Sequence, residues 1–418
     1  MKRIMAGLVW FCAVSGVIII ALVLFSKIND LVGSFIRNDG QGQGRQTQNE
    51  ETADKTKEIN ITEETEMING VDEEIIELNC YNGDLELPVS GATGYASVDM
   101  DLIIVTDAST NEWEVVAKLK AGAAFVIVRE EGDWWYVSVG GAGGMKGWVL
   151  HSLCMINLPD VVPSIIYNNT SAYSSGCRTS GESIPGITGE QMYSYSDRAD
   201  GRAYNERLQK YEYIVPVLYS AAKRVRQTQQ NALENGDSIV MYEAFRPYST
   251  QKKSYEAILA FSNANPHIKA NLSTPQWNIS WFVASGISNH QRGYAVDASL
   301  AKVLIQEYAK TGSYHYKQIT RADYYEMPTP IHELSIESIV YTRPVQIESL
   351  DAWRTAEYSE GMQNNLPARN LQKYFTDAGF TPLASEWWHF NDLHTLFGIT
   401  NLCGGDFEIK DCFSIPPN

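Results

Sequence analysis

Two short stretches of the sequence constrain the fold most, because side chains able to bind a metal ion must converge from both. One stretch contains His290 and Asp297, and the other contains Glu386 and His389. Two imidazoles and one carboxylate are good zinc ligands, and three protein ligands with one open position are typical of a catalytic zinc site. The fold must therefore bring these two distant stretches to one place.

The spacing within each stretch predicts how the side chains are used. Gly293 lies between His290 and Asp297 and permits a tight turn, so these two residues can converge from a loop and the strand that follows it. Glu386 precedes His389 by three positions, and a turn-like backbone would place both on one side. We therefore predict His290, Asp297 and His389 as metal ligands. Glu386 is the predicted general base, which later protonates the leaving amine.

Two neighbouring residues are candidate substrate-binding residues. Ser288 opens the first stretch, and its hydroxyl could orient the His290 region or the substrate by hydrogen bonding. Trp388 lies in the second stretch, where its ring would exclude water and contact the substrate. Core packing is the alternative explanation for Trp388. A single histidine is more often structural than ligating, so the prediction depends on the combination of residues.

The N-terminal segment predicts a membrane anchor. An apolar run from Ile4 to Phe25 follows Lys2 and Arg3. A helix of about 20 apolar residues spans a bilayer, and positive charges before it favour a cytoplasmic N-terminus. We therefore expect residues 1–27 to be a single-pass transmembrane anchor at the cell membrane, with the catalytic region extracytoplasmic. A cleaved signal peptide is the alternative.

Composition limits the partners and the use of cysteine. The formal net charge of −17 argues against nucleic-acid binding, which needs clustered Lys and Arg. Much of the acidity lies in residues 50–77, and we expect residues 28–93 to form a disordered acidic stalk. None of the six cysteines forms a CxxC pair, so a structural zinc cluster is not expected. Cys403 and Cys412 could close a short disulfide loop.

Residues 94–155 predict a small all-β barrel, because short apolar segments alternate there with Asp, Asn and Gly. The strand-like segments are Tyr95–Val98, Leu102–Val105, Glu114–Ala117, Ala124–Val128, Trp134–Val139 and Gly147–Val149. The region resembles the bacterial SH3-like domain in Leu119–Gly122, Gly132–Val137 and Gly147–Val149. This resemblance implies binding to peptidoglycan or its stem peptides. A folded spacer without a ligand is the alternative.

Residues 156–418 carry a mixed pattern of helices and strands. Helices are predicted over residues 215–232, 249–261 with Ser249 as N-cap, 301–310, and 367–378 ending at Gly379, and a buried strand is predicted over residues 237–242. The predicted fold class is an α+β zinc peptidase domain with a small all-β SH3-like barrel and an N-terminal transmembrane helix.

Two strings in this last region carry a further resemblance. SxHxxGxAxD and EWWHF resemble motifs of the zinc D-alanyl-D-alanine peptidases of the VanX and VanY type, and the similarity covers about residues 157–392. The turn at Phe245–Pro247 and the segment Met327–Pro330 are further points of similarity. The resemblance implies Zn2+ bound by the three ligands named above, with Glu386 as catalytic acid and base.

The resemblance also implies that Arg246 stabilises the oxyanion of the reaction, and a guanidinium aimed at developing negative charge is a strong electrostatic catalyst. A structural salt bridge is the alternative for Arg246. In strict dipeptidases the segment that corresponds to residues 327–332 reads MGTPFD, and its Asp holds the free amino group of the dipeptide. This chain has His332 at that position and lacks the fixed negative charge.

The chain is therefore predicted to be a zinc-dependent D,D-carboxypeptidase that acts on the terminal D-Ala-D-Ala bond of peptidoglycan stem peptides. A D-Ala-D-Ala dipeptidase and a peptidoglycan endopeptidase are alternatives within the same class of enzyme. A non-catalytic wall-binding protein is the alternative from another class.

Overall fold

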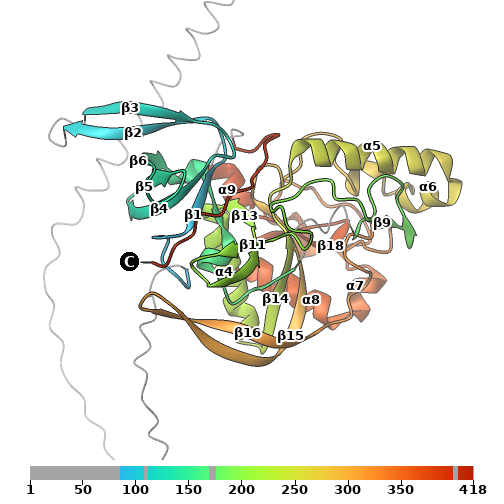
Figure 1. Cartoon of the computed structure of the whole chain (residues 1–418). Coiled ribbons are helices and arrows are strands. Elements are labelled where there is room, and N and C mark those ends of the chain that lie inside the picture. Colours follow the sequence, from blue (N-terminus) through green and yellow to red (C-terminus); the bar gives the residue numbers. More distant parts are fainter. Residues whose placement is uncertain (1–84, 108–111, 169–175, 399–402, 418) are drawn as a thin grey trace, which may run out of the picture. The chain divides into compact units, whose positions relative to one another are not determined.

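The computed structural model describes residues 85–107, 112–168, 176–398 and 403–417. Two β-sheets dominate this part of the chain (Figure 1). The second sheet carries the candidate metal ligands, so the first is described briefly.

The first sheet has eight antiparallel strands, and all six segments predicted from apolar alternation contribute to it. In β5, the side chains of Trp135 and Val137 are buried whereas Trp134 is exposed, which is the period of two expected for a half-buried strand. In spatial order the strands are β13 (Pro216–Leu218), β7 (Cys154–Asn157), β1 (Thr93–Ala96), β4 (Ala124–Glu131), β5 (Trp134–Val139), β6 (Met145–Leu150), β2 (Met100–Asp107) and β3 (Glu112–Leu119).

The predicted fold class needs two corrections. No helix among the described residues is long and apolar enough to cross a membrane. The predicted transmembrane helix over residues 1–27, and the single-pass membrane localisation inferred from it, are therefore not supported, and that segment lies outside the described residues. The all-β region is also not a barrel on its own, because β13 comes from beyond it and pairs with β7.

Only part of the predicted stalk belongs to the described residues. Residues 28–84 lie outside the described part of the chain. Leu85 and Leu87 are buried, and β1 begins at Thr93, so the predicted disorder does not extend over residues 85–93.

The second sheet is mixed and holds the two stretches that the sequence analysis singled out. β14 pairs in parallel with β8 and antiparallel with β15, and β15 pairs antiparallel with β18 and β16. In spatial order the strands are β17 (Thr381–Leu383), β18 (Glu386–Asn391), β15 (Ala295–Thr311), β14 (Asp237–Glu243) and β8 (Ile166–Tyr167), and β16 (Tyr314–Tyr324) extends β15 as a long hairpin.

Three of the predicted helices form, with shifted starts. They are α4 (Tyr219–Leu233), α5 (Tyr248–Ala264) and α8 (Leu366–Asp377). The first starts late because Pro216–Leu218 form β13. The second has Pro247, not Ser249, as its N-cap. Gly379 follows the third with φ +94°, a left-handed conformation that favours glycine after a helix. Helices α4 and α8 pack against each other and against strands of the second sheet.

The helix predicted over residues 301–310 is wrong, because this segment is the second half of β15. Its Ala, Lys, Leu, Gln and Glu residues favour helices when taken alone. However, β15 is paired with β16 from Ala301 to Thr311, and its Ala301 and Lys302 also pair with β14. These ladders satisfy the backbone of the segment and override its local preference.

The remaining elements are short. They are α2 (Leu158–Val161), α6 (Pro266–Leu272), α7 (Glu360–Asn364), α9 (Leu393–Gly398), the 3-10 turns at His151–Leu153, Ile279–Trp281 and Ala352–Thr355, and two hairpins formed by β9 (Arg178–Thr179) with β10 (Glu182–Ser183) and β11 (Arg202–Asn205) with β12 (Lys210–Tyr213).

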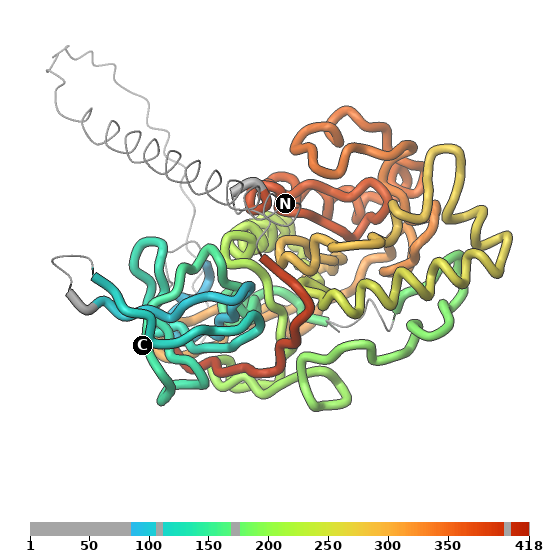
Figure 2. The backbone as a smooth tube through the Cα atoms, turned by 90° about the horizontal axis from the view of Figure 1, so that it is seen from above, coloured from blue at the N-terminus to red at the C-terminus, as the bar shows by residue number. Residues whose placement is uncertain are grey.

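Residues 403–417 run back along the first sheet, so that the end of the described chain lies beside its beginning (Figure 2). The N–H of Gly404 donates to the carbonyl of Ser97 at 2.9 Å, and the N–H of Ile415 donates to the carbonyl of Gly91 at 2.8 Å. Cys403 and Cys412 in this segment are free thiols, so the disulfide considered from the sequence is not formed.

The same segment also packs behind the candidate site. Phe407 stacks on Phe245, with ring centroids 4.7 Å apart and planes 15° from parallel. Gly404 has φ +92°, and a Cβ there would lie 1.9 Å from the carbonyl oxygen of Gln291. Residues 403–417 therefore support the chain on both sides of the site, next to Arg246 and next to His290.

Candidate metal centre

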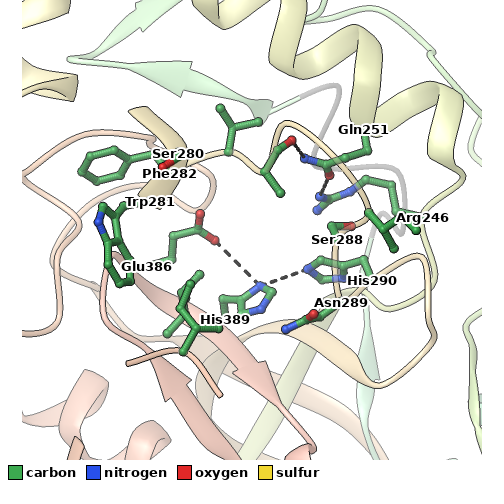
Figure 3. A pocket seen from close by; sticks show the side chains of 15 residues that line it. Arg246, Gln251, Ser280, Trp281, Phe282, Ser288, Asn289, His290, Glu386 and His389 are labelled. Carbon is green, nitrogen blue, oxygen red and sulfur yellow. Dashed lines mark hydrogen bonds and ion pairs between the residues drawn. The ribbon is translucent and has the colours of Figure 1, made fainter. Parts of the chain in front are cut away.

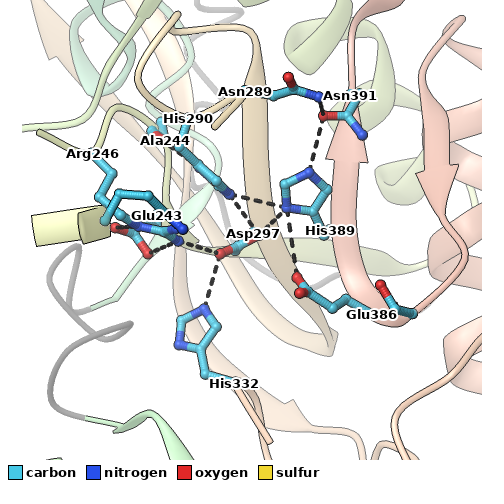
Figure 4. Close-up of polar contacts among 12 residues, drawn as sticks. Glu243, Ala244, Arg246, Asn289, His290, Asp297, His332, Glu386, His389 and Asn391 are labelled. Atoms are coloured by element: carbon cyan, nitrogen blue, oxygen red, sulfur yellow. Dashed lines mark hydrogen bonds and ion pairs between the residues drawn. The ribbon is translucent and has the colours of Figure 1, made fainter. Parts of the chain in front are cut away.

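The three predicted ligands meet where β15 and β18 lie side by side (Figure 4). Asp297 on β15 and His389 on β18 are direct partners in the antiparallel pairing, so their side chains share one face. His290 comes from the loop before β15, where Gly293 turns the chain with φ +77°. Oδ1 of Asp297 lies 3.3 Å from Nε2 of His290 and 3.1 Å from Nδ1 of His389.

In each of the two imidazole rings, the outer nitrogen, which points away from Asp297, has an oxygen partner. The inner nitrogen therefore faces Asp297. Nδ1 of His290 lies 2.7 Å from the carbonyl oxygen of Ala244, and Nε2 of His389 lies 3.0 Å from Oδ1 of Asn391. Because these oxygens only accept, each outer nitrogen carries the proton when the ring is neutral, and the inner nitrogen keeps its lone pair. Such outer contacts are usual for histidines that bind metal ions.

The donor set fits a metal ion. The three ligand atoms of His290, Asp297 and His389 lie within 4.8 Å of one another, and all three residues are buried. These buried groups could therefore hold a metal ion.

Burial and mutual contacts set the charges of the ligands. Burial lowers the pKa of His290, which favours the neutral imidazole that a metal needs. Burial acts in the same direction on His389, but its contact with Asp297 and the negative charge of that carboxylate raise its pKa overall. Burial opposes ionisation of Asp297 as well, yet its contacts with His290, His332 and His389 hold its pKa well below the usual range.

Glu386 is placed beside the donors and has an unusual acidity. Its Oε2 lies 3.8 Å from Nδ1 of His389. Glu386 begins β18 next to a register shift in the pairing with β17, rather than lying in the turn that the sequence predicted. Burial raises the pKa of Glu386 to about 8, the charge of His389 opposes this shift, and the charge of Asp297 adds to it. A carboxyl group of this acidity can both take up and release a proton near neutral pH.

A pocket opens onto Glu386 and His389 (Figure 3). Apolar side chains form much of its wall, and a few polar groups converge on it, as in most sites for small ligands. The lining residues are Arg246, Gln251, Ser280, Trp281, Phe282, Val283, Ala284, Ile287, Ser288, Asn289, His290, Ile347, Leu383, Glu386 and His389.

Arg246 lies on the pocket wall and is firmly held. Its Nε and one terminal nitrogen lie 2.9 Å from the two carboxylate oxygens of Glu243, and the other terminal nitrogen lies 2.6 Å from Oε1 of Gln251. The first terminal nitrogen also lies 3.4 Å from Oδ2 of Asp297. The salt bridge considered for Arg246 from the sequence is therefore present. It holds the guanidinium on the pocket wall, so a structural role and a position at the site are compatible.

The two candidate substrate-binding residues lie in different places. Ser288 lines the pocket, and its buried hydroxyl has no hydrogen-bond partner among the described residues. Trp388 is fully buried and is not among the residues that line the pocket. Its ring packs edge-on against that of His332, with centroids 5.7 Å apart, so Trp388 supports the site from behind.

Three further residues of the site were not predicted. Asn391 holds His389, and its position two residues later on the same strand could have indicated it, because side chains alternate along a strand. Glu243 ends the strand before Arg246 and could have been suggested as a partner for that cation. His332 contacts Asp297, whereas the motif resemblance had placed it at a substrate-binding position.

Comparison with known proteins identifies no family for this chain. Neither a protein-family model nor a curated protein matches its sequence. A reaction must therefore be proposed from the geometry of the site together with the motif resemblance.

Proposed function

We propose that this protein is a zinc-dependent D,D-carboxypeptidase that hydrolyses the terminal D-Ala-D-Ala bond of peptidoglycan stem peptides. One observation carries the proposal: three buried metal donors lie beside a carboxyl group of near-neutral pKa and a fixed guanidinium, and His290, His389, Glu386 and Arg246 of this group line one pocket. This combination supplies the parts that hydrolysis of a peptide bond needs.

His290, Asp297 and His389 would hold the zinc ion. Imidazole and carboxylate donors suit zinc. When bound, the ion would act as a Lewis acid that polarises the peptide carbonyl and acidifies the attacking water. The chain itself fixes the three donors, through the Ala244 carbonyl and Asn391 on the imidazoles and through the pairing of β15 with β18.

Glu386 would carry the proton. It would accept a proton from the attacking water and deliver it to the leaving amine of the terminal alanine. Its burial keeps the carboxyl in a range where both steps are feasible. Arg246 would stabilise the negative charge that develops on the carbonyl oxygen, and the hydroxyl of Ser288 could hydrogen-bond the substrate within the pocket.

The pocket favours a peptide without a free amino group near the bond that is cut. Apart from Glu386, none of the described lining residues is acidic, so the ammonium group of a free dipeptide would find no carboxylate partner. His332, at the position of the ammonium-binding Asp in the dipeptidase motif, is buried and faces Asp297. Apolar walls at Trp281 and Ile347 suit the methyl groups of alanine.

Exposed aromatic residues of the first sheet support a second contact between this protein and peptidoglycan. Trp113 is 61% exposed and Trp134 is 39% exposed. Arg129 lies over the rings of Tyr136 and Trp148, at 4.4 and 4.8 Å from their centroids. Exposed aromatic side chains such as Trp113 and Trp134 supply a large contact area for a ligand. Co-sedimentation with purified peptidoglycan tests this contact, and unchanged binding of the Trp113→Ser variant would argue against it.

The direct test of the proposed reaction uses a muramyl pentapeptide ending in D-Ala-D-Ala. The zinc-loaded full-length chain is incubated with it, and mass spectrometry should show the loss of one alanine. The Glu386→Gln variant, prepared in the same way, is the matched control. Cleavage of free D-Ala-D-Ala with an intact pentapeptide would replace the proposal by a dipeptidase, and no cleavage of either would reject a D-Ala-D-Ala peptidase.

A further inference from the structure

A second group of donors shares Asp297 with the candidate metal centre. Glu243, Asp297 and His332 are all buried, and their ligand atoms also lie within 4.8 Å of one another. By donor type and spacing alone, this second group resembles the first.

A side-chain cation already occupies the second group (Figure 4). One terminal nitrogen of Arg246 lies 2.9 Å from Oε2 of Glu243 and 3.4 Å from Oδ2 of Asp297, and its Nε lies 2.9 Å from Oε1 of Glu243. A metal ion bound there would have to displace this guanidinium against the repulsion of like charges. The second group is therefore complete without a metal ion, and the role of His332 has to be sought in what it does to Asp297.

His332 is held rigidly against Asp297. Its Nε2 lies 3.0 Å from Oδ2 of Asp297, and the residue is fully buried. Its backbone has φ +62°, a left-handed conformation that histidine adopts more readily than most residues. The N–H of Arg178 donates to the carbonyl of His332 at 3.0 Å, and the ring stands edge-on to Trp388.

We propose that His332 is a positioning residue for the metal centre. The Nε2–H of His332 donates to Oδ2 of Asp297, and this contact fixes the rotation of the carboxylate so that Oδ1 faces His290 and His389. The inference rests on the metal-binding part of the proposed function and is independent of the peptide substrate. Outer partners of metal ligands commonly contribute about 10- to 100-fold to metal affinity.

The test compares His332→Gln with His332→Met. These side chains have the same length along the chain, and only Gln offers an N–H near the position of Nε2. Zinc affinity is measured by competition with a chromophoric chelator, and zinc content by elemental analysis. We expect His332→Met to bind zinc about 10- to 100-fold more weakly than the wild type, and His332→Gln to recover most of that loss.

A third variant and a control protect the test against misfolding. Asn tolerates a left-handed backbone, but its shorter amide cannot reach Oδ2, so His332→Asn should bind zinc as weakly as His332→Met. His394 is exposed on α9, and His394→Gln should bind zinc like the wild type. Thermal unfolding of the metal-free proteins identifies any variant that is not folded, and such a variant is left out of the comparison.

The outcomes separate this inference from the proposed reaction. Wild-type affinity in a folded His332→Met or His332→Asn variant would overturn the positioning role. So would equal weakness of folded His332→Gln and His332→Met. A second zinc ion in the wild type that is lost in His332→Met would also overturn it, because the second group would then be a metal site. If the wild type cleaves no peptide but the variants follow the expected order of affinity, the proposed reaction fails and the positioning role stands.

Discussion

The two sides of Asp297 use the same carboxylate in different ways. Oδ1 faces two imidazoles whose outer nitrogens are already bonded, so their lone pairs converge on one point. Oδ2 faces a guanidinium and an imidazole N–H, so its negative charge is already matched by protein groups. Acidic and histidine donors at the right spacing therefore do not by themselves define a metal site. The supporting contacts decide which side is left for the metal.

The largest expected effect is on kcat and concerns Glu386, which lies near the imidazoles that face Oδ1 of Asp297. Replacing Glu386 with Gln keeps its shape and removes its ability to carry a proton, and general acid-base groups contribute about 100- to 10,000-fold to rate. We expect kcat for the pentapeptide to fall within that range, while zinc content stays that of the wild type. Retained turnover would remove Glu386 from the mechanism, and loss of zinc would show that it acts mainly by holding the metal.

The next largest effect concerns Arg246, which contacts Oδ2 of Asp297. Arg246→Met should lower kcat/KM by about 100- to 1,000-fold, the usual effect of losing one group that stabilises an oxyanion. It should also destabilise the protein by about 3–5 kcal/mol, because Glu243 would stay buried without its cation. Urea unfolding and steady-state kinetics measure the two effects separately.

A double variant decides between the two roles of Arg246. Combining Arg246→Met with Glu243→Gln removes the unpaired charge and should restore most of the stability without restoring activity. If activity returns together with stability, the guanidinium serves only as a structural partner of Glu243.

A smaller effect on zinc affinity is expected for Asn391, which contacts the outer nitrogen of His389. Asn391→Leu removes the oxygen that accepts from Nε2 of His389 and should weaken zinc binding by about 10-fold. Asn391→Asp is the matched control, because it keeps an acceptor at the same place and should bind zinc at least as tightly as the wild type. Equal affinities of the Leu variant and the wild type would show that the outer contact does not matter.

A further effect is on stability. A ligand that binds only the folded state stabilises a protein by about 2.7 kcal/mol at 100 times its Kd. Zinc should therefore raise the Tm and a chelator should lower it again, as calorimetry can measure. Asp297→Asn should lose this response, and a response that persists would place the metal elsewhere.

The sequence predicted the fold best where local pattern and tertiary pairing agree. Trp134 is exposed whereas Trp135 and Val137 are buried, as an apolar strand pattern predicts, and β5 spans Trp134–Val139. Ala301–Lys310 contains many helix-forming residues but belongs to β15, because β16 pairs with it along most of this segment. Such pairing is non-local and leaves little trace in the segment itself.

The same distinction holds for the site. His290, Asp297 and His389 could be recognised because their chemistry and spacing are joint constraints, and the structure brings them together. His332 could not, because its contact with Asp297 depends on where a distant loop with a left-handed residue comes to lie. Trp388 shows the limit for aromatic residues, since a ring near a site can equally well line it or support it.

The segment formed by residues 403–417 has a consequence for the order of events during synthesis. The donors and Arg246 leave the ribosome before Phe407, which stacks behind Phe245, and before Gly404, which fits against Gln291. A nascent chain therefore carries every donor of the centre before it carries the segment that packs behind their loops. The packing behind these loops therefore depends on a segment that is synthesised after all the donors.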